Sequence, residues 1–310
     1  MTILGLSAGN RGGSAEILLK EALKAAEDAG AQVELVRVDD LRLNQGPDAT
    51  DDDGPWFWDR LMESDALIVS TPIYSRTVPG KLRLLGDKIS GPQADVAFTS
   101  ELLRMRANGE PISVNFEIDE RVLRSRIGAY IAVGGSIPPR WKTLALPLMH
   151  SLSESMQMAI VDQVQFAGAG SPKSIVLDDA ALERARRLGR NVAEQLGRDY
   201  ADAEYRGEKG VCPLCHLDVI AIVDGGIECA TCGARGEFSV VDGAVAITFT
   251  PEGLAQSVLD MGEKLDHFRE VQETARRHAP ERERIDALAR GYEAFDPSIR
   301  PGIGVDHAEA

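Results

Sequence analysis

The sequence lacks any apolar run of the roughly 18 to 20 residues that a membrane-spanning helix needs. Its first six residues are apolar, but they are too few for a signal peptide, and no basic segment precedes them. We therefore expect a cytoplasmic protein with no membrane partner. The N-terminal residues are better explained as the first buried strand of a globular fold, and a length of 310 residues suffices for two domains.

Basic residues are also scarce. The chain has 34 Lys and Arg against 49 Asp and Glu, which gives a formal net charge of −15, and no dense basic block is visible. Such a chain repels nucleic acid and anionic membranes, so we expect neither as a partner. Any phosphate ligand must then be held by local dipoles rather than by the overall field of the protein.

Cysteine is absent except in one short segment, where two C-x-x-C pairs are separated by thirteen residues: Cys212, Cys215, Cys229 and Cys232. In a reducing compartment such a cluster indicates a metal rather than disulfides. Each pair supplies two thiolates from one tight turn, and two pairs complete a tetrahedron. The module resembles a zinc ribbon, so we predict zinc as the metal. Rubredoxin-like iron is the less favoured alternative, because a glycine usually follows each rubredoxin pair and His216 follows the first pair here.

Residues 1–206 alternate short apolar segments with amphipathic ones. The predicted strands are 2–6, 32–38, 66–71, 128–133 and 158–166, and the predicted helices are 14–30, 56–64, 81–90, 144–157 and 178–196. This alternation predicts an α/β fold with a parallel five-stranded sheet covered on both faces. Residues 91–126 interrupt the rhythm, and we interpret them as an insertion that forms a lid or a subunit contact.

The character of the chain changes after residue 206. Residues 207–250 hold the cysteines and three short β-like pieces at 219–223, 238–241 and 244–249, which predicts a small β-ribbon built around the four cysteines. Residues 251–310 form a helical segment and a tail, and apolar residues recur every three or four positions from Leu254 to Val271. That apolar stripe is expected to pack on the ribbon or on a partner subunit.

A glycine-rich turn links the first predicted strand to the first helix. Free backbone N–H groups and the positive end of the helix dipole make such a turn a phosphate cradle. Ser7, Asn10 and Ser14 add hydrogen-bond donors, and Arg11 adds charge. The alternative is a plain turn in which Ser14 caps the helix. The Gly-Lys-Ser/Thr ending of a P-loop and the G-x-G-x-x-G dinucleotide pattern are both missing.

Three further segments carry a family resemblance: Thr71-Pro72-Ile73-Tyr74 with Gly80-Lys81-Leu82 and Asp87-Lys88, then 131–136, then 143–161. Together with the first loop they resemble, over residues 2–196, the NADPH-dependent FMN reductases and their iron–sulfur flavoprotein relatives. The resemblance implies a flavodoxin-like, doubly wound sheet that binds FMN at the carboxyl ends of its strands. It also implies NAD(P)H as the electron donor and a homodimer or homotetramer as the assembly.

The same resemblance implies which residues hold the flavin. The phosphate would lie on the first loop and the isoalloxazine ring beside the loops that follow the third and fourth strands. The residues implied are Ser7, Asn10, Arg11, Ser14, Ala15, Pro72, Ile73, Tyr74, Ser75, Gly134 and Gly135. Ala8, Asn10 and Ala15 depart from the Ser, Arg and Thr that the family usually carries. Residues 41–53 contain no cysteine, so an iron–sulfur cluster at that place is excluded.

These features favour an NAD(P)H-dependent FMN oxidoreductase that reduces a small organic acceptor, of the quinone, flavin, nitro, azo or enone type. The alternatives are an electron-transfer partner of another enzyme and a non-catalytic binding protein that keeps the fold. No catalytic side chain is assigned. His150 could approach the flavin ring or the substrate, although a lone histidine on a helix is more often structural. Arg140 and Lys142 could meet cofactor phosphates, and a solvated surface explains them at least as well.

Overall fold

The computed structural model describes residues 1–44, 51–112, 117–293, 295 and 297, so most of the predicted tail lies outside the described residues. Met1–Leu265 pack as one compact unit, and Asp266–Ala310 form a second. Within the described part of the chain, no helix is long and apolar enough to cross a membrane.

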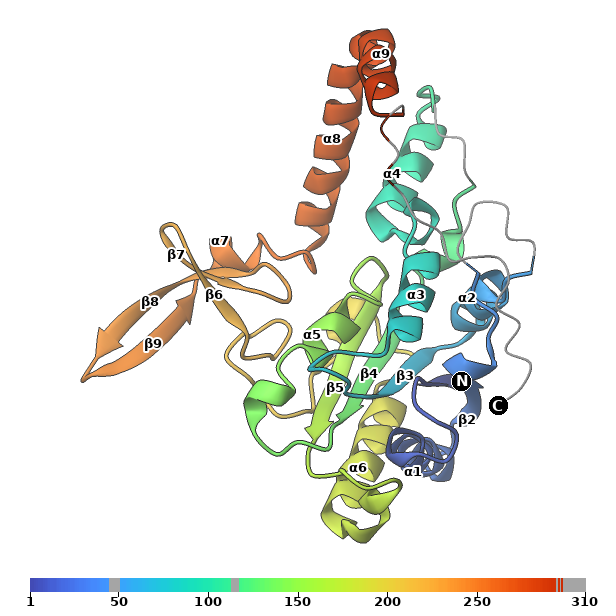
Figure 1. Cartoon of the computed structure of the whole chain (residues 1–310), viewed down its shortest axis with the longest axis vertical. Helices are drawn as coiled ribbons and strands as arrows, with labels where there is room; N and C mark the ends of the chain where they lie inside the picture. The colour runs from blue at the N-terminus through green and yellow to red at the C-terminus, as the bar shows by residue number, and fades with distance from the viewer. Residues whose placement is uncertain (45–50, 113–116, 294, 296, 298–310) are drawn as a thin grey trace. The chain divides into compact units, whose positions relative to one another are not determined.

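A five-stranded parallel sheet forms the centre of the first unit (Figure 1). Its strands are β1 Thr2–Ser7, β2 Gln32–Arg37, β3 Ala66–Pro72, β4 Arg126–Val133 and β5 Met158–Phe166. Their spatial order is β2-β1-β3-β4-β5, the flavodoxin-like order, whose direction of winding reverses between β1 and β3. All eight residues of β4 are buried. This burial explains why the central strands are continuous apolar runs.

Helices cover both faces of this sheet. They are α1 Ser14–Asp28, α2 Gly54–Glu63, α3 Gly80–Ile89, α5 Ala145–His150 and α6 Asp179–Gln195. The helix α4 Val96–Ala107 instead contacts the short turns at Pro92–Ala94 and Glu120–Leu123. The α1 and α6 helices pack on one face, where Leu18 and Leu188 are fully buried. They approach so closely that a Cβ on Gly189 would lie 1.9 Å from the carbonyl oxygen of Ala22, so only glycine fits there.

Two of the expected helices are shorter than their patterns suggest. The helix predicted over 144–157 ends at His150, and turns follow, in which the Ser151 hydroxyl donates to the carbonyl of Leu148. The C-terminal helical segment is three helices, α7 Pro251–Leu254, α8 Met261–His278 and α9 Arg282–Glu293. Pro280 lies in the break between the last two, as its missing N–H predicts.

The insertion predicted at 91–126 contains α4. Asp95 caps this helix by accepting hydrogen bonds from the amides of Ala97 and Phe98. The amide of Val96 donates to the carbonyl of Ser155 at 2.9 Å, which ties the insertion to the chain ahead of β5. Its role as a lid or a subunit contact stays a prediction.

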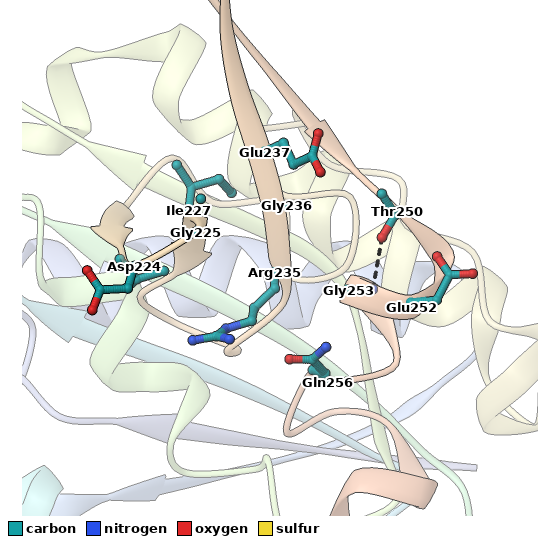
Figure 2. A pocket seen from close by; sticks show the side chains of 12 residues that line it. Asp224, Gly225, Ile227, Arg235, Gly236, Glu237, Thr250, Glu252, Gly253 and Gln256 are labelled. Atoms are coloured by element: carbon teal, nitrogen blue, oxygen red, sulfur yellow. Dashed lines mark hydrogen bonds between the residues drawn. The ribbon is translucent and has the colours of Figure 1, made fainter.

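The cysteine segment forms a four-stranded antiparallel sheet, one strand more than expected. Its strands are β6 Ile220–Val223, β7 Gly226–Cys229, β8 Arg235–Val241 and β9 Ala244–Phe249, in sequence order. A cavity of about 180 Å³ lies between the β6–β7 turn, β8 and α7 (Figure 2). A Cβ on Gly253 would lie 2.0 Å from the carbonyl oxygen of Arg235, and Thr250 caps the turn at Gly253, so backbone packs directly on backbone here.

Glu16 is a fully buried carboxylate that joins α1 to β2. Its two oxygens accept hydrogen bonds from Nε and Nη2 of Arg37 at 2.8 and 3.0 Å, and Lys20 Nζ lies 2.7 Å away. The hydrogen bonds from Arg37 lower the pKa of Glu16 from 4.5 to about 2. The ionised form is therefore favoured by folding.

This shift predicts a pH-dependent contribution to stability. A carboxyl whose pKa is depressed in the folded state stabilises the fold above its unfolded pKa and loses that stabilisation as the pH falls toward 2. We expect Glu16→Gln to lower the free energy of unfolding by about 2–4 kcal/mol at pH 7. The deficit relative to wild type should shrink between pH 5 and pH 2, as measured by urea unfolding. Glu27→Gln is the control, because Glu27 is exposed on the same helix and makes no ion pair with any described residue. A deficit that does not depend on pH would contradict the assignment.

Candidate functional site

A cavity of about 510 Å³ opens at the carboxyl ends of the parallel strands. The loops after β1, β3, β4 and β5 line it, which places it at the reversal point of the sheet. Eight of the predicted flavin contacts lie in its lining: Asn10, Arg11, Ser14, Ala15, Pro72, Ile73, Tyr74 and Gly135. Ser7, Ser75 and Gly134 do not line it.

The N-terminus of α1 faces this cavity without a side-chain cap. The N-cap residue is Gly13, and its neighbour Ser14 makes no capping hydrogen bond, so the expectation that Ser14 caps the helix is wrong. Among the described residues, the amides of Ser14, Ala15 and Glu16 find no acceptor. A helix end with free N–H groups needs an external acceptor, and an anion is the acceptor that its dipole favours.

Ser7 lies beneath the same loop. It is fully buried, and its hydroxyl has no hydrogen-bond partner in the described structure. The side chain points toward α1, because a Cβ on Gly5, two residues earlier, would meet Leu23 of that helix. Ser70, in register with Ser7 on β3, donates to the carbonyl of Ala15 at 2.8 Å. The Ser7 hydroxyl is therefore an unpartnered buried group beneath the sheet edge, but it does not line the cavity.

Glycines bring the four loops together at van der Waals distance. A Cβ on Gly9 would lie 3.1 Å from Pro72 and 3.2 Å from the side chain of Ala15. The departure at Ala15 is thus accommodated by packing, and this residue offers its amide where the family offers a hydroxyl as well. A Cβ on Gly135 would lie 3.0 Å from Cα of Gly170, so the loops after β4 and β5 touch through their backbones.

The loop after β3 is a tight turn that presents Tyr74. Tyr74 and Thr77 exchange two backbone hydrogen bonds of 2.9 Å, and Ser75 and Arg76 between them have φ values of 47° and 74°. These values belong to the left-handed region that turns of this kind require. The Tyr74 side chain is 52% exposed at the cavity. Ser75 sits at the tip of the turn and away from the cavity lining.

Sequence reasoning missed the loop that follows β5. Ala169, Gly170, Ser171, Pro172 and Lys173 line the cavity, although none of them was a predicted contact. The signal was present, because a Gly- and Pro-rich stretch follows the fifth strand and must therefore open on the same edge of the sheet as the other three loops.

His150, Arg140 and Lys142 do not line this cavity. His150 is buried on α5, where Nε2 lies 2.8 Å from Oε1 of Gln163 and the ring packs edge-on against Tyr130. Burial lowers its pKa. This environment is that of a structural histidine in a buried hydrogen-bond network.

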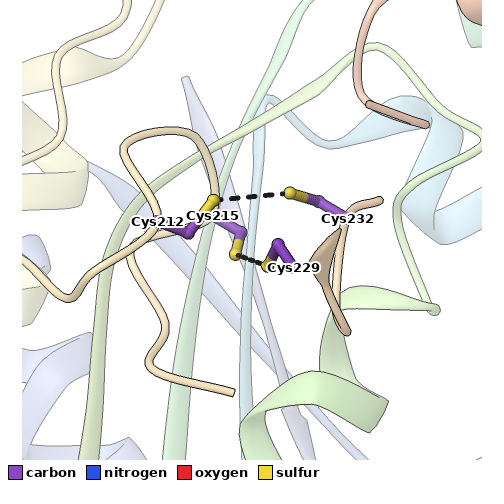
Figure 3. A group of neighbouring side chains, drawn as sticks. All are labelled: Cys212, Cys215, Cys229 and Cys232. Carbon is purple, nitrogen blue, oxygen red and sulfur yellow. Dashed lines mark hydrogen bonds between the residues drawn. The ribbon is translucent and has the colours of Figure 1, made fainter. Parts of the chain in front are cut away.

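The four cysteines converge on one point (Figure 3). All four sulfurs lie within 4.8 Å of one another and are buried, and the pairs Cys212–Cys232 and Cys215–Cys229 have Sγ–Sγ distances of 3.6 and 3.4 Å. A disulfide would need about 2.05 Å. A tetrahedron with metal–sulfur bonds of about 2.3 Å has edges of about 3.8 Å, so these residues fit a four-coordinate metal.

The two cysteine turns have the same backbone structure. The amide of the fifth residue donates to the carbonyl of the first, from His216 to Cys212 at 3.0 Å and from Gly233 to Cys229 at 2.8 Å. Both fifth residues have positive φ, 57° at His216 and 73° at Gly233. His216 accepts a conformation that suits glycine, and its ring stacks on Tyr205 with a centroid distance of 3.6 Å.

A single glutamine joins the cysteine cluster to the parallel sheet. Gln163 on β5 is buried, and its Nε2 donates to the carbonyl of Cys215 at 2.7 Å while its Oε1 contacts His150. The cysteines also belong to the same apolar core as α3 and α5. The cysteine module, residues 207–250, therefore belongs to the same compact unit as the sheet.

Comparisons with known proteins agree with this geometry. The sequence profile of the NADPH-dependent FMN reductases matches residues 1–172. The chain is 33% identical over 295 residues to a flavone synthase from Aspergillus candidus, covering 88% of this chain and 89% of that protein. A solved structure of a flavone reductase superposes with a TM-score of 0.82 at 28% identity, covering 97% of this chain and all of the other. An iron–sulfur flavoprotein from Methanocaldococcus jannaschii is 26% identical over 212 residues, covering 63% of this chain and 96% of that protein.

Proposed function

Because the chain belongs to the family of NADPH-dependent FMN reductases, we propose that it is an FMN-dependent oxidoreductase that exchanges reducing equivalents between NAD(P)H and a planar enone of the flavone class. Written as a reduction, NAD(P)H, a proton and the enone give NAD(P)⁺ and the saturated ketone. The likeness to proteins named for flavones extends over nearly the whole chain, including the cysteine module, and this observation favours an enone over quinone, nitro or azo acceptors.

The cavity supplies what FMN needs. The free amides of Ser14 and Ala15, which line the cavity at the N-terminus of α1, would hold the phosphate. The segment from Pro72 to Tyr74 and the backbone at Gly135 would lie beside the ring. Bound FMN would supply hydride transfer between the nicotinamide and the acceptor.

The chain's own residues would position the acceptor. Tyr74 presents an exposed aromatic face at the cavity, and such a face suits a planar conjugated ligand. Ile73 and Val133 add apolar lining. This lining would keep water away from the part of the cavity where the flavin ring would lie. Solvent at the exposed mouth beside Tyr74 can supply the proton that the reduced carbon requires.

We further propose that the cysteine cluster binds zinc. Four thiolates fill the coordination sphere of the metal, so its role is to hold the module in its folded form rather than to take part in the reaction. Assembly as a homodimer or homotetramer and location in the cytoplasm stay predictions, and light scattering of the purified protein tests the first.

The decisive experiment combines a spectrum with a product analysis. We expect purified protein to show flavin absorption and to oxidise NADPH or NADH when a flavone is present, with a product two mass units heavier than the flavone by mass spectrometry. A quinone, a nitroarene and an azo dye of similar size are the comparison acceptors. A protein that cannot be reconstituted with FMN would refute the proposal, and faster turnover of a comparison acceptor than of any flavone would overturn the acceptor class.

Tyr74 offers a test of how the acceptor is held. We expect Tyr74→Ala to raise the KM for the enone about tenfold, because loss of an aromatic stacking surface costs on the order of 1–1.5 kcal/mol. Tyr74→Phe keeps the ring and should behave like wild type. Steady-state kinetics with saturating NADPH measure this effect; an unchanged KM in Tyr74→Ala would show that the acceptor binds elsewhere.

A further inference from the structure

Lys173 lies directly over the loop that follows β1. A methyl group placed on Gly12 would be 4.0 Å from Cε of Lys173, and both the lysine and the adjacent loop residue Gly13 line the cavity. The lysine side chain is exposed and forms no ion pair with any residue in the described ranges. An ammonium group is therefore available within reach of the free amides of α1.

Arg11, the cation that the sequence predicts for this loop, forms an ion pair with a carboxylate of the protein. Nη2 of Arg11 lies 3.0 and 3.1 Å from the two carboxylate oxygens of Asp40. Arg37, the next arginine along the chain, is bound by Glu16 and lies 3.9 Å from Asp40. Both guanidinium groups thus face carboxylates, and their charge toward an incoming anion is offset.

The backbone at Lys173 is held in place. Its φ is 63°, a left-handed conformation that costs about 1 kcal/mol or more for a residue with a side chain. The turn is closed by hydrogen bonds from the amide of Ser174 to the carbonyl of Ser171 at 3.1 Å and from Val176 to Lys173 at 3.2 Å. Pro172 precedes it and restricts the chain further. The side chain therefore leaves the loop from a fixed point above Gly12.

We infer that Lys173, rather than Arg11, supplies the positive charge that binds the 5′-phosphate of FMN, together with the uncapped amides of α1. The net charge of the chain is −15, so the overall field opposes a phosphate dianion, and a local cation at this edge would offset that repulsion. A charge-assisted contact between ammonium and phosphate has the required strength. The inference rests on the proposed function, because it assumes that FMN is the ligand.

Binding of two flavins separates this role from a structural one. Full-length apoprotein is titrated with FMN and with riboflavin, which lacks the phosphate, and the quenching of flavin fluorescence gives each Kd. We expect Lys173→Gln to raise the Kd for FMN about tenfold, as for loss of one hydrogen bond to a charged group, and to leave the Kd for riboflavin unchanged. Lys24→Gln removes an equal charge from an exposed position on α1 that makes no ion pair with the described residues, and this variant should bind both flavins like wild type. Arg11→Gln should weaken FMN binding less than Lys173→Gln does.

Other results of the same titrations would assign a different role to Lys173. If Lys173→Gln weakens FMN and riboflavin equally, the lysine serves the fold of the loop, and the inference is wrong. If FMN binding is unchanged while the KM for NADPH rises, the lysine serves the nicotinamide cofactor instead. Failure of wild-type protein to bind either flavin would refute the proposed function itself. If the wild type and Lys173→Gln bind FMN equally well, the proposed function stands and only the inference about Lys173 is wrong. Lys173→Arg keeps the charge and should retain FMN binding.

Discussion

Replacing Cys229 with serine should release the bound metal and unfold the four-stranded module. Cys229 is buried, and its sulfur lies 3.4 Å from that of Cys215. A structural metal in a four-thiolate site contributes on the order of 10 kcal/mol of folding free energy to the small domain that it organises. Three remaining thiolates cannot close the coordination sphere, so most of that contribution should be lost.

The loss of stability should extend beyond the turn that contains Cys229. The cysteines belong to the apolar core that includes Leu82 and Met149, and Gln163 on β5 bonds to the carbonyl of Cys215. Loss of the metal would remove the partner of a buried amide on the edge strand of the parallel sheet. We therefore expect the main thermal transition to fall by more than about 10 °C, well beyond the few degrees that about 1 kcal/mol produces.

Metal analysis and calorimetry on the same samples test this prediction. Wild-type protein should carry one equivalent of metal, and Cys229→Ser should carry little or none. Ala230→Ser introduces the same side chain at the exposed neighbouring position and should retain both the metal and the transition temperature. A colourless, zinc-containing protein agrees with the proposed metal, whereas the visible bands of ferric thiolate would assign iron. Full stability of Cys229→Ser without metal would contradict a structural role.

The spacing of the cysteines was enough to predict the metal centre because its geometry is local. Two C-x-x-C turns fix four sulfurs once the chain between them folds back, and the turn at Asp224-Gly225 does so, with Gly225 at a φ of 84°. The strand β7 could not be predicted in the same way. It has four residues, of which the first is a glycine and the last a cysteine of the cluster, so only two residues remain to carry a β pattern.

The parallel sheet was predictable for a different reason, because its central strands β3 and β4 are apolar runs that burial on both faces explains. The ion pairs between side chains at the site could not be predicted from the sequence. Arg11 looked like the cation of the first loop from its position, but Asp40, from a distant part of the sequence, binds it. Lys173 stands 162 positions away from Arg11 in the sequence and meets the same loop only because β1 and β5 end on one edge of the sheet.

An aspartate at position 14 should leave the fold intact and abolish tight FMN binding. Ser14 is the first residue of α1, lines the cavity and is not needed as a cap. A carboxylate in the first turn interacts favourably with the helix dipole, worth about 0.3–1 kcal/mol, so the apoprotein should unfold at the same or a higher temperature. The same carboxylate would compete for the free amides and repel the phosphate.

The expected loss of FMN affinity in Ser14→Asp follows from the repulsion between the carboxylate and the phosphate. Two like charges about 4 Å apart repel by about 4 kcal/mol at an effective dielectric constant of about 20, and solvent at the cavity mouth reduces this figure. We therefore expect the Kd for FMN to rise about a hundredfold in Ser14→Asp, equivalent to about 2.7 kcal/mol. Ser14→Asn has the same shape without the charge and should lose far less affinity.

Opposite changes in stability and in affinity make this variant informative. Most substitutions that weaken cofactor binding also destabilise the protein, because they damage the loop that forms the site. Here the apoprotein should melt no lower than wild type by differential scanning calorimetry, whereas the FMN-dependent rise in melting temperature should disappear. If added FMN still stabilises Ser14→Asp as much as wild type, the phosphate does not lie at the N-terminus of α1, and the free amides of Ser14, Ala15 and Glu16 must have another acceptor.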